Sequence, residues 1–90
     1  MLPYNELFKI RLKAAARAGA NRTIHYGTNG RLPPPVALSI VQYDGDTGFY
    51  LFYLDETGHE QTDTYHDTLD AAFRQAEYEF GVKQTDWLAL

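Results

Sequence analysis

Residues 62–81, TDTYHDTLDAAFRQAEYEFG, constrain the fold most, because a strand pattern leads directly into a complete helix signature. On a wheel of about 100° per residue, one arc gathers an apolar stripe: Leu69, Ala72, Phe73, Ala76 and Phe80. Asp67 precedes the stripe as the predicted N-cap, and Asp70 lies in the first turn, where the helix dipole favours a carboxylate. Gly81 provides the left-handed end. We predict a helix that packs on a core, with Tyr78 on its outer side.

Three strands are predicted before this helix. Residues 36–43, Phe49–Leu54 and Glu60–His66 are rich in β-branched and aromatic side chains, and the turn sequences DGDTG and DETGH separate them. The middle strand, FYLFYL, is apolar on both faces, so both faces are covered or one is an interface. We therefore predict a three-stranded antiparallel meander. A loop or a second subunit then covers the face away from the helices.

The first 18 residues predict an N-terminal helix. Pro3 suits a first helical turn, and residues 5–18 contain few residues that resist helix formation. On the wheel, Arg11 falls within the apolar face. Its guanidinium either reaches a carboxylate of the acidic half or binds an anion in a pocket.

The expected fold class is α+β. It comprises the N-terminal helix, the three-stranded antiparallel meander, a fourth edge strand at residues 22–26 if the weak pattern there forms one, and the C-terminal helix packed on the sheet. Residues 1–90 are expected to form one domain, since this length suffices for a single core.

Charge divides the chain in two. Residues 1–43 carry six basic residues and one acidic residue, whereas residues 44–90 carry two basic residues and eleven acidic ones. The halves attract each other within one molecule, or the acidic half forms an interaction surface. The basic stripe of Lys9, Lys13 and Arg17 is too weak to indicate nucleic-acid binding beside so many carboxylates.

Several classes of site lack their sequence signals. The chain contains no cysteine, which excludes disulfides and thiolate chemistry. Ser39, the only serine, lies in a predicted buried strand, and no phosphate-binding or dinucleotide glycine motif is present. His59 and His66 lack a metal-ligand spacing. We expect no enzyme activity, no cofactor and no metal.

The chain also lacks an apolar run long enough for a membrane span and an N-terminal signal-peptide pattern. We therefore expect a cytoplasmic protein without membrane association.

The segment TDTYHDTLDAAFRQAEYEFGV and the following Trp87 resemble a group of small, poorly characterised bacterial proteins. These share a hairpin with an L-D-E-x-G turn, a T-D-T-aromatic-H strand, a helix ending in E-F-G and a nearby tryptophan. The resemblance covers residues 49–87. It implies an immunity-type or other small partner-binding protein of a bacterial toxin system, and it carries no catalytic residue.

The expected function is that of a small, acidic, non-enzymatic protein-binding module that engages a basic partner. The predicted contact residues are the carboxylates of the acidic half: Asp55, Glu56, Glu60, Asp63, Asp70 and Glu77. An acidic surface speeds encounter with a basic partner and selects among partners. The alternative is a small-ligand or anion-binding domain whose pocket is lined by Arg11, Tyr65 and His66. A homodimer through the sheet face is also expected.

Overall fold

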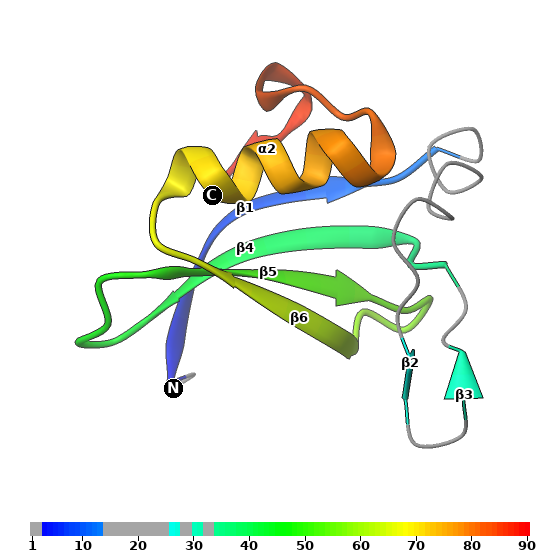
Figure 1. The fold of residues 1–90 in the computed structure, drawn as a ribbon, viewed down its shortest axis with the longest axis horizontal. Coiled ribbons are helices and arrows are strands. Elements are labelled where there is room, and N and C mark those ends of the chain that lie inside the picture. Colours follow the sequence, from blue (N-terminus) through cyan, green and yellow to red (C-terminus); the bar gives the residue numbers. More distant parts are fainter. Residues whose placement is uncertain (1–2, 14–25, 28–29, 32–33) are drawn as a thin grey trace.

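The computed structural model describes residues 3–13, 26–27, 30–31 and 34–90. These residues form a five-stranded antiparallel sheet in the order β6-β5-β4-β1-β7, with one α-helix over it (Figure 1). The sheet strands are β1 (Tyr4–Arg11), β4 (Ala37–Tyr43), β5 (Phe49–Leu54), β6 (Glu60–His66) and β7 (Leu88–Ala89). Strands β2 (Tyr26–Gly27) and β3 (Gly30–Arg31) pair separately, and α2 (Leu69–Phe80) precedes the 3₁₀ helix η2 (Gln84–Asp86).

The predicted N-terminal helix is wrong where the structure describes it, because residues 4–11 form β1. In FKIRLK, Phe8, Ile10 and Leu12 alternate with basic residues, which is a strand period, although the same stretch also fits a helical one. Pairing with β4 decides between the two periods, since it sets Phe8 against Ile40. The described residues are mostly sheet, with five strands in the main sheet, two in a separate pair and one α-helix, so the predicted two helices on a three-stranded meander are also wrong.

Two parts of the N-terminal prediction cannot be compared with the structure. Residues 14–18 of the predicted helix lie outside the described residues. So do positions 22–25 of the predicted edge strand, whose last residue, Tyr26, begins β2.

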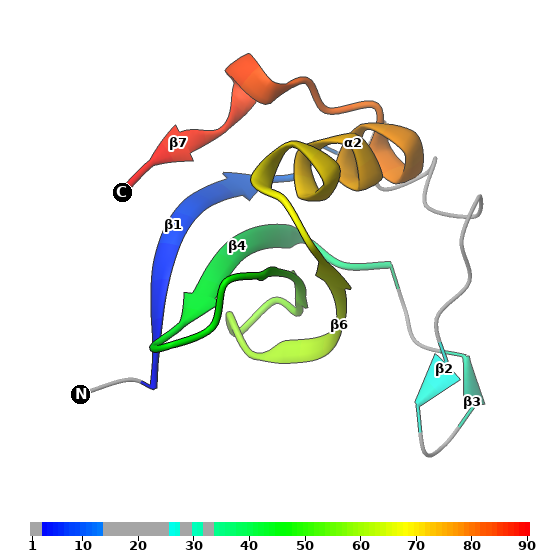
Figure 2. The ribbon, with the colours of Figure 1, turned by 60° about the vertical axis from the view of Figure 1, so that its left-hand side comes forward.

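A bulge at Leu7 places Tyr4 and Phe8 of β1 on opposite faces of the sheet. Glu6 pairs with Val41 but Phe8 pairs with Ile40, so one extra residue enters β1 between these pairs. The extra residue reverses the side to which later side chains point. The Leu7 carbonyl accepts the Leu90 N–H at 3.0 Å, so the C-terminal segment meets β1 at the bulge. Strand β1 is strongly curved (Figure 2).

Apolar side chains cover both faces of the sheet. The face under α2 carries the larger cluster, with buried residues from both the sheet and the helix: Leu12, Leu38, Ile40, Leu51, Tyr53, Ala72, Phe73, Ala76, Phe80, Val82 and Trp87. The opposite face carries Val36, Ala37, Val41, Phe52 and Leu54. Strand β5 is therefore covered on both sides, as its FYLFYL pattern requires.

The structure confirms the predicted helical stripe and its end. Ala72, Phe73, Ala76 and Phe80 are buried, and Leu69 packs against them. Gly81 has a φ of 71° and donates its N–H to the carbonyl of Glu77 at 2.8 Å. Tyr78 is 58% exposed, as predicted.

The N-cap prediction is wrong by one residue. The hydroxyl of Thr68, not the carboxylate of Asp67, accepts the Ala71 N–H at 3.1 Å. After the helix, Val82 and Trp87 fold back into the core, where the Trp87 and Phe73 ring centroids lie 5.7 Å apart.

Within the described residues, no helix has the length and apolar character needed to cross a bilayer.

Replacing Thr68 should show which residue caps α2. Thr68→Ala removes the acceptor of the Ala71 N–H and should lower the free energy of unfolding by about 1 kcal/mol. Asp67→Ala is the matched control, and it should cost only a few tenths of a kcal/mol through the helix dipole. Urea denaturation of both variants measures the difference. A larger loss in Asp67→Ala would contradict the assignment.

Candidate binding surface

Four tyrosines from four strands line the face of the sheet opposite α2. This tyrosine face comprises Tyr4, Tyr43, Tyr50 and Tyr65. Tyr4 pairs with Tyr43 across β1 and β4, and Tyr50 pairs with Tyr65 across β5 and β6. Neighbouring ring centroids lie 5.4 Å, 5.1 Å and 5.2 Å apart along this series, at tilted or edge-to-face angles. The rings therefore form a continuous series across the sheet.

The rings cover the smaller apolar cluster. Tyr4 meets Phe52 edge to face at a centroid distance of 5.3 Å, and Tyr43 and Tyr50 also pack on this cluster. Phe52 is only 3% exposed. Tyrosine suits such a position because its ring covers apolar surface while its hydroxyl stays near water.

The outermost ring, that of Tyr65, needs a glycine beside it. A Cβ at position 48 would collide with the Tyr65 ring and hydroxyl. Gly48 is buried, and its N–H donates to Asp46 Oδ1 at 3.0 Å. Tyr65 itself stays 48% exposed. The DGDTG turn thus supports the exposed end of the tyrosine face.

Glu60 and Asp63 lie on this same face because of a second bulge. Asp63 pairs with Phe52 but Glu60 pairs with Leu54, so β6 has one extra residue between these pairs. Positions three apart in a regular strand point to opposite sides, and the bulge brings both carboxyl groups to one side. A hydrogen bond with Asp63, partial burial and the Asp63 charge raise the pKa of Glu60 to about 7.

Besides burial, nearby carboxylates raise the pKa of two tyrosine hydroxyls on this face. Burial raises the pKa of Tyr43, and the charges of Glu60 and Asp63 raise it further. Burial likewise raises the pKa of Tyr65, with Asp46 and Asp67 adding to the effect. The face therefore combines aromatic rings with carboxylates that repel one another, an arrangement that favours positively charged groups.

The other predicted acidic contacts lie elsewhere. Asp55 Oδ1 accepts hydrogen bonds from the backbone of Thr57 and His59 at 2.9 Å and 3.0 Å, so it shapes the β5–β6 turn. The Thr57 hydroxyl, which donates to the same oxygen, is the main cause that lowers the pKa of Asp55. Glu56 is exposed in the same turn.

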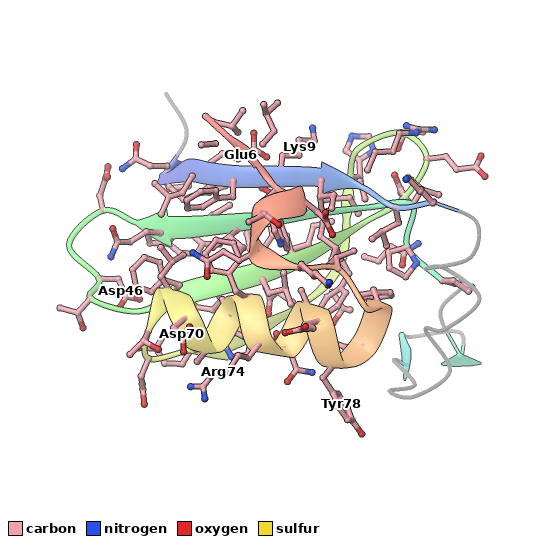
Figure 3. The ribbon with its side chains drawn as sticks, turned by 90° about the horizontal axis from the view of Figure 1, so that it is seen from above. Glu6, Lys9, Asp46, Asp70, Arg74 and Tyr78 are labelled. Atoms are coloured by element: carbon pink, nitrogen blue, oxygen red, sulfur yellow. The ribbon has the colours of Figure 1, made fainter. Side chains whose placement is uncertain are left out.

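Asp70 and Glu77 are exposed on α2. Asp70 pairs with Arg74 at 3.0 Å, and Figure 3 shows both on the side of the helix that carries Tyr78. The six predicted carboxylates are thus divided between the turn, the tyrosine face and the helix.

The structure does not bring Arg11, Tyr65 and His66 together. Strands β4 and β5 lie between β1, which carries Arg11, and β6, which carries the other two. Tyr65 and His66 are consecutive in β6 and so point to opposite faces. Arg11 instead lines two open clefts, of about 520 Å³ and about 450 Å³, and Ile10 and Asp86 line both of them.

A buried polar network lies on the α2 side of β5 and β6. The Tyr53 hydroxyl donates a hydrogen bond to Glu79, which also accepts from Gln75 Nε2 at 2.9 Å. Thr64 Oγ1 lies 3.4 Å from the Tyr53 hydroxyl and 2.8 Å from His66 Nε2. Tyr53 and Glu79 are 0% and 1% exposed. The network joins α2 to β5 and β6.

The sequence prediction missed Glu79, although a signal for it was present. On the helical wheel Glu79 lies beside Ala72, at the border of the apolar stripe. A charged residue at that border turns inward when a strand offers it a hydrogen-bond donor, and Tyr53 is such a donor. Burial and the neighbouring Glu79 raise the pKa of Tyr53, and burial lowers the pKa of His66.

The described residues contain no group of three or more metal-ligating side chains. His59 and His66 lie in the β5–β6 turn and at the far end of β6, and the Nδ1 of His59 contacts the Thr57 hydroxyl at 2.7 Å. Ser39, 1% exposed, donates to Glu6 Oε2 at 2.6 Å.

Comparison of the chain with family models, curated proteins and solved structures gives no match.

Removing the Tyr53 hydroxyl should test the network. Tyr53→Phe takes a donor from the buried carboxylate of Glu79 and should lower the free energy of unfolding by about 1–3 kcal/mol. Tyr65→Phe removes the same oxygen atom from a half-exposed ring and should change it by less than about 0.5 kcal/mol. Thermal or urea unfolding compares the two variants. Equal effects would show that the network adds nothing to stability.

Replacing Asp63 should change how stability depends on pH. The pKa of Glu60 is about 7 in the folded chain, above its ordinary value of 4.5 in an unfolded one. The folded state therefore binds this proton more tightly, and the free energy of unfolding falls as pH rises from 4.5 through about 7. Asp63→Asn removes the hydrogen-bonding carboxylate and its charge but leaves the partial burial of Glu60, so this fall should become smaller. NMR titration of the Glu60 carboxyl carbon and urea unfolding at several pH values measure both effects. A Glu60 pKa that stays near 7 in the variant would contradict the coupling.

Proposed function

We propose that this protein is a non-enzymatic protein-binding module that engages a basic partner through Glu60, Asp63 and the adjoining tyrosine face. The observation that supports the proposal most directly is the placement of two interacting carboxyl groups beside a series of tyrosine rings. A lysine or arginine of a partner would neutralise the carboxylates, and it would also meet the electron-rich face of a ring.

The proposal narrows the acidic surface expected from the sequence. Asp55 accepts backbone hydrogen bonds within the β5–β6 turn, and Asp70 forms a salt bridge with Arg74. Charge pairs on an exposed helix contribute little to binding energy, whereas charges beside partly buried rings lose more water on contact and discriminate better between partners. We therefore place Glu60 and Asp63 at the centre of the contact, with Glu56 at its rim.

The non-enzymatic part of the proposal rests on the surroundings of the hydroxyl groups. The hydroxyl of Thr64 lies between Tyr53 and His66, and that of Ser39 is bound to Glu6. A nucleophilic hydroxyl needs an adjacent base and open access to a substrate. In this arrangement the Thr64 and His66 contact is partly buried and continues through Tyr53 to Glu79 on α2.

Residues 49–87 resemble a group of small bacterial proteins, which implies an immunity-type or other partner-binding role, and we extend the proposal to that class. Homodimerisation through the tyrosine face is the competing proposal, because α2 covers the other face of β5. Sedimentation equilibrium over a range of concentrations separates a dimer from a monomer with a free tyrosine face.

Neutralising the central carboxylates should slow association with a basic probe. We expect Glu60→Gln combined with Asp63→Asn to reduce the association rate of a fluorescent arginine-rich peptide several-fold at low salt, and less at physiological salt. Stopped-flow fluorescence measures the rates. Asp70→Asn combined with Glu77→Gln removes at least as much charge from α2, because Glu60 is partly protonated near pH 7, and it serves as the control. Equal slowing by the two pairs would show attraction by net charge alone and reject the proposed surface.

A further inference from the structure

Strand β6 forms an open edge of the sheet in the part of the chain that the structure describes. It pairs with β5 on one side, and no described strand pairs with its other side (Figure 1). In such a strand every second residue directs its backbone N–H and C=O away from the sheet. At the opposite edge β7 has two residues, whereas β6 has seven. The longer edge offers more backbone groups for pairing.

Part of this edge is regular enough to receive another strand. The bulge lies near the start of β6, and residues 62–66 pair with β5 without a further shift in register. Proline would interrupt pairing, and none occurs in β6. Proteins often block a free edge with proline, inward lysines or repeated bulges. Residues 62–66 contain no proline, lysine or bulge, and Asp63 is the one carboxylate among them.

The side chains along the edge indicate the chemistry of a matching strand. Asp63 and Tyr65 lie on the tyrosine face, and Thr62, Thr64 and His66 lie on the α2 side. Residues directly opposite one another in an antiparallel pair interact through their side chains. A lysine suits the position opposite Asp63, and an arginine suits the one opposite Tyr65. Valine or threonine suits the alternate positions beside the two threonines.

A second copy of the chain fits this edge poorly. Pairing of β6 with β6 of another copy would bring the carboxylates of both chains to one seam, with Glu60, Asp63 and Asp67 from each. Glu60 and Asp63 already repel each other within one copy. Adding a like-charged strand raises this cost, whereas a basic strand lowers it.

We propose that the open edge of β6 accepts an extended, basic segment of a partner protein as a sixth strand. This inference rests on the proposed function and adds a binding mode to it. Backbone hydrogen bonds supply affinity, and the alternating side chains supply selectivity. The partner segment alternates basic residues with β-branched ones over about five positions, since β6 offers residues 62–66.

The test uses the full chain and a peptide with the core Thr-Arg-Val-Lys-Val. Antiparallel pairing sets its arginine opposite Tyr65 and its lysine opposite Asp63. Two further peptides carry N-methyl groups, one at the odd core positions and the other at the even ones. Both keep the charge and the side chains, but each loses the amide hydrogens on one side of the strand. NMR titration of the ¹⁵N-labelled protein gives the affinities.

We expect the unmodified peptide to shift the amide signals of β6. One methylated peptide should lose at least about tenfold in affinity, since it forfeits hydrogen bonds worth about 1 kcal/mol each. The other should stay within about twofold of the unmodified peptide. This asymmetry would not arise from charge attraction, because all three peptides carry the same charge.

The Asp63→Asn variant separates the inference from the proposed function. It should weaken binding of the unmodified peptide several-fold, while Glu77→Gln on α2 should leave binding unchanged. Equal binding of all three peptides, with the Asp63 effect intact, would overturn strand addition and leave the proposed function standing. An unchanged affinity in Asp63→Asn would reject both. Concentration-dependent shifts of β6 amides without peptide would identify a second copy as the occupant and overturn the inference.

Discussion

The pairing of β1 with β4 is the interaction on which the rest of the structure depends. It brings residues 4–11 beside residues 37–43 and sets Phe8 and Ile10 against Ile40 and Leu38, under α2. The bulge between Glu6 and Phe8 directs Tyr4 to the other face, where it covers Phe52. One strand thus supplies both apolar clusters. Without the bulge, Tyr4 would point to the same side as Phe8.

The same solution recurs in β6. There the bulge brings Glu60 and Asp63 to one side and creates a repulsion that a regular strand would avoid. Regular strands would separate these carboxyl groups and would place Tyr4 on the same face as Phe8. The two bulges therefore shape both the core and the candidate binding surface.

The sequence predicted elements whose signals are local. The helix stripe and the glycine end of α2 follow from residue spacing, and strands Phe49–Leu54 and Glu60–His66 have the predicted bounds. It failed where two periods coexist. Phe8 and Leu12 satisfy both a helix and a strand, and only the distant partner β4 decides. The predicted N-cap was Asp67 and the observed one is Thr68, because either residue type can cap a helix. The inward turn of Glu79 depends on Tyr53, which no local pattern places.

The proton that Glu60 holds has a consequence for recognition. A cation placed beside Glu60 and Asp63 favours the ionised form of Glu60, so binding of a cation there near neutral pH releases protons into the solvent. Affinity for a cation therefore rises with pH near neutrality. The heat of association varies with the ionisation enthalpy of the buffer, because the buffer takes up the released protons. A partner that binds elsewhere on the molecule would not change the protonation of Glu60, so its binding would release no proton from Glu60 to the buffer.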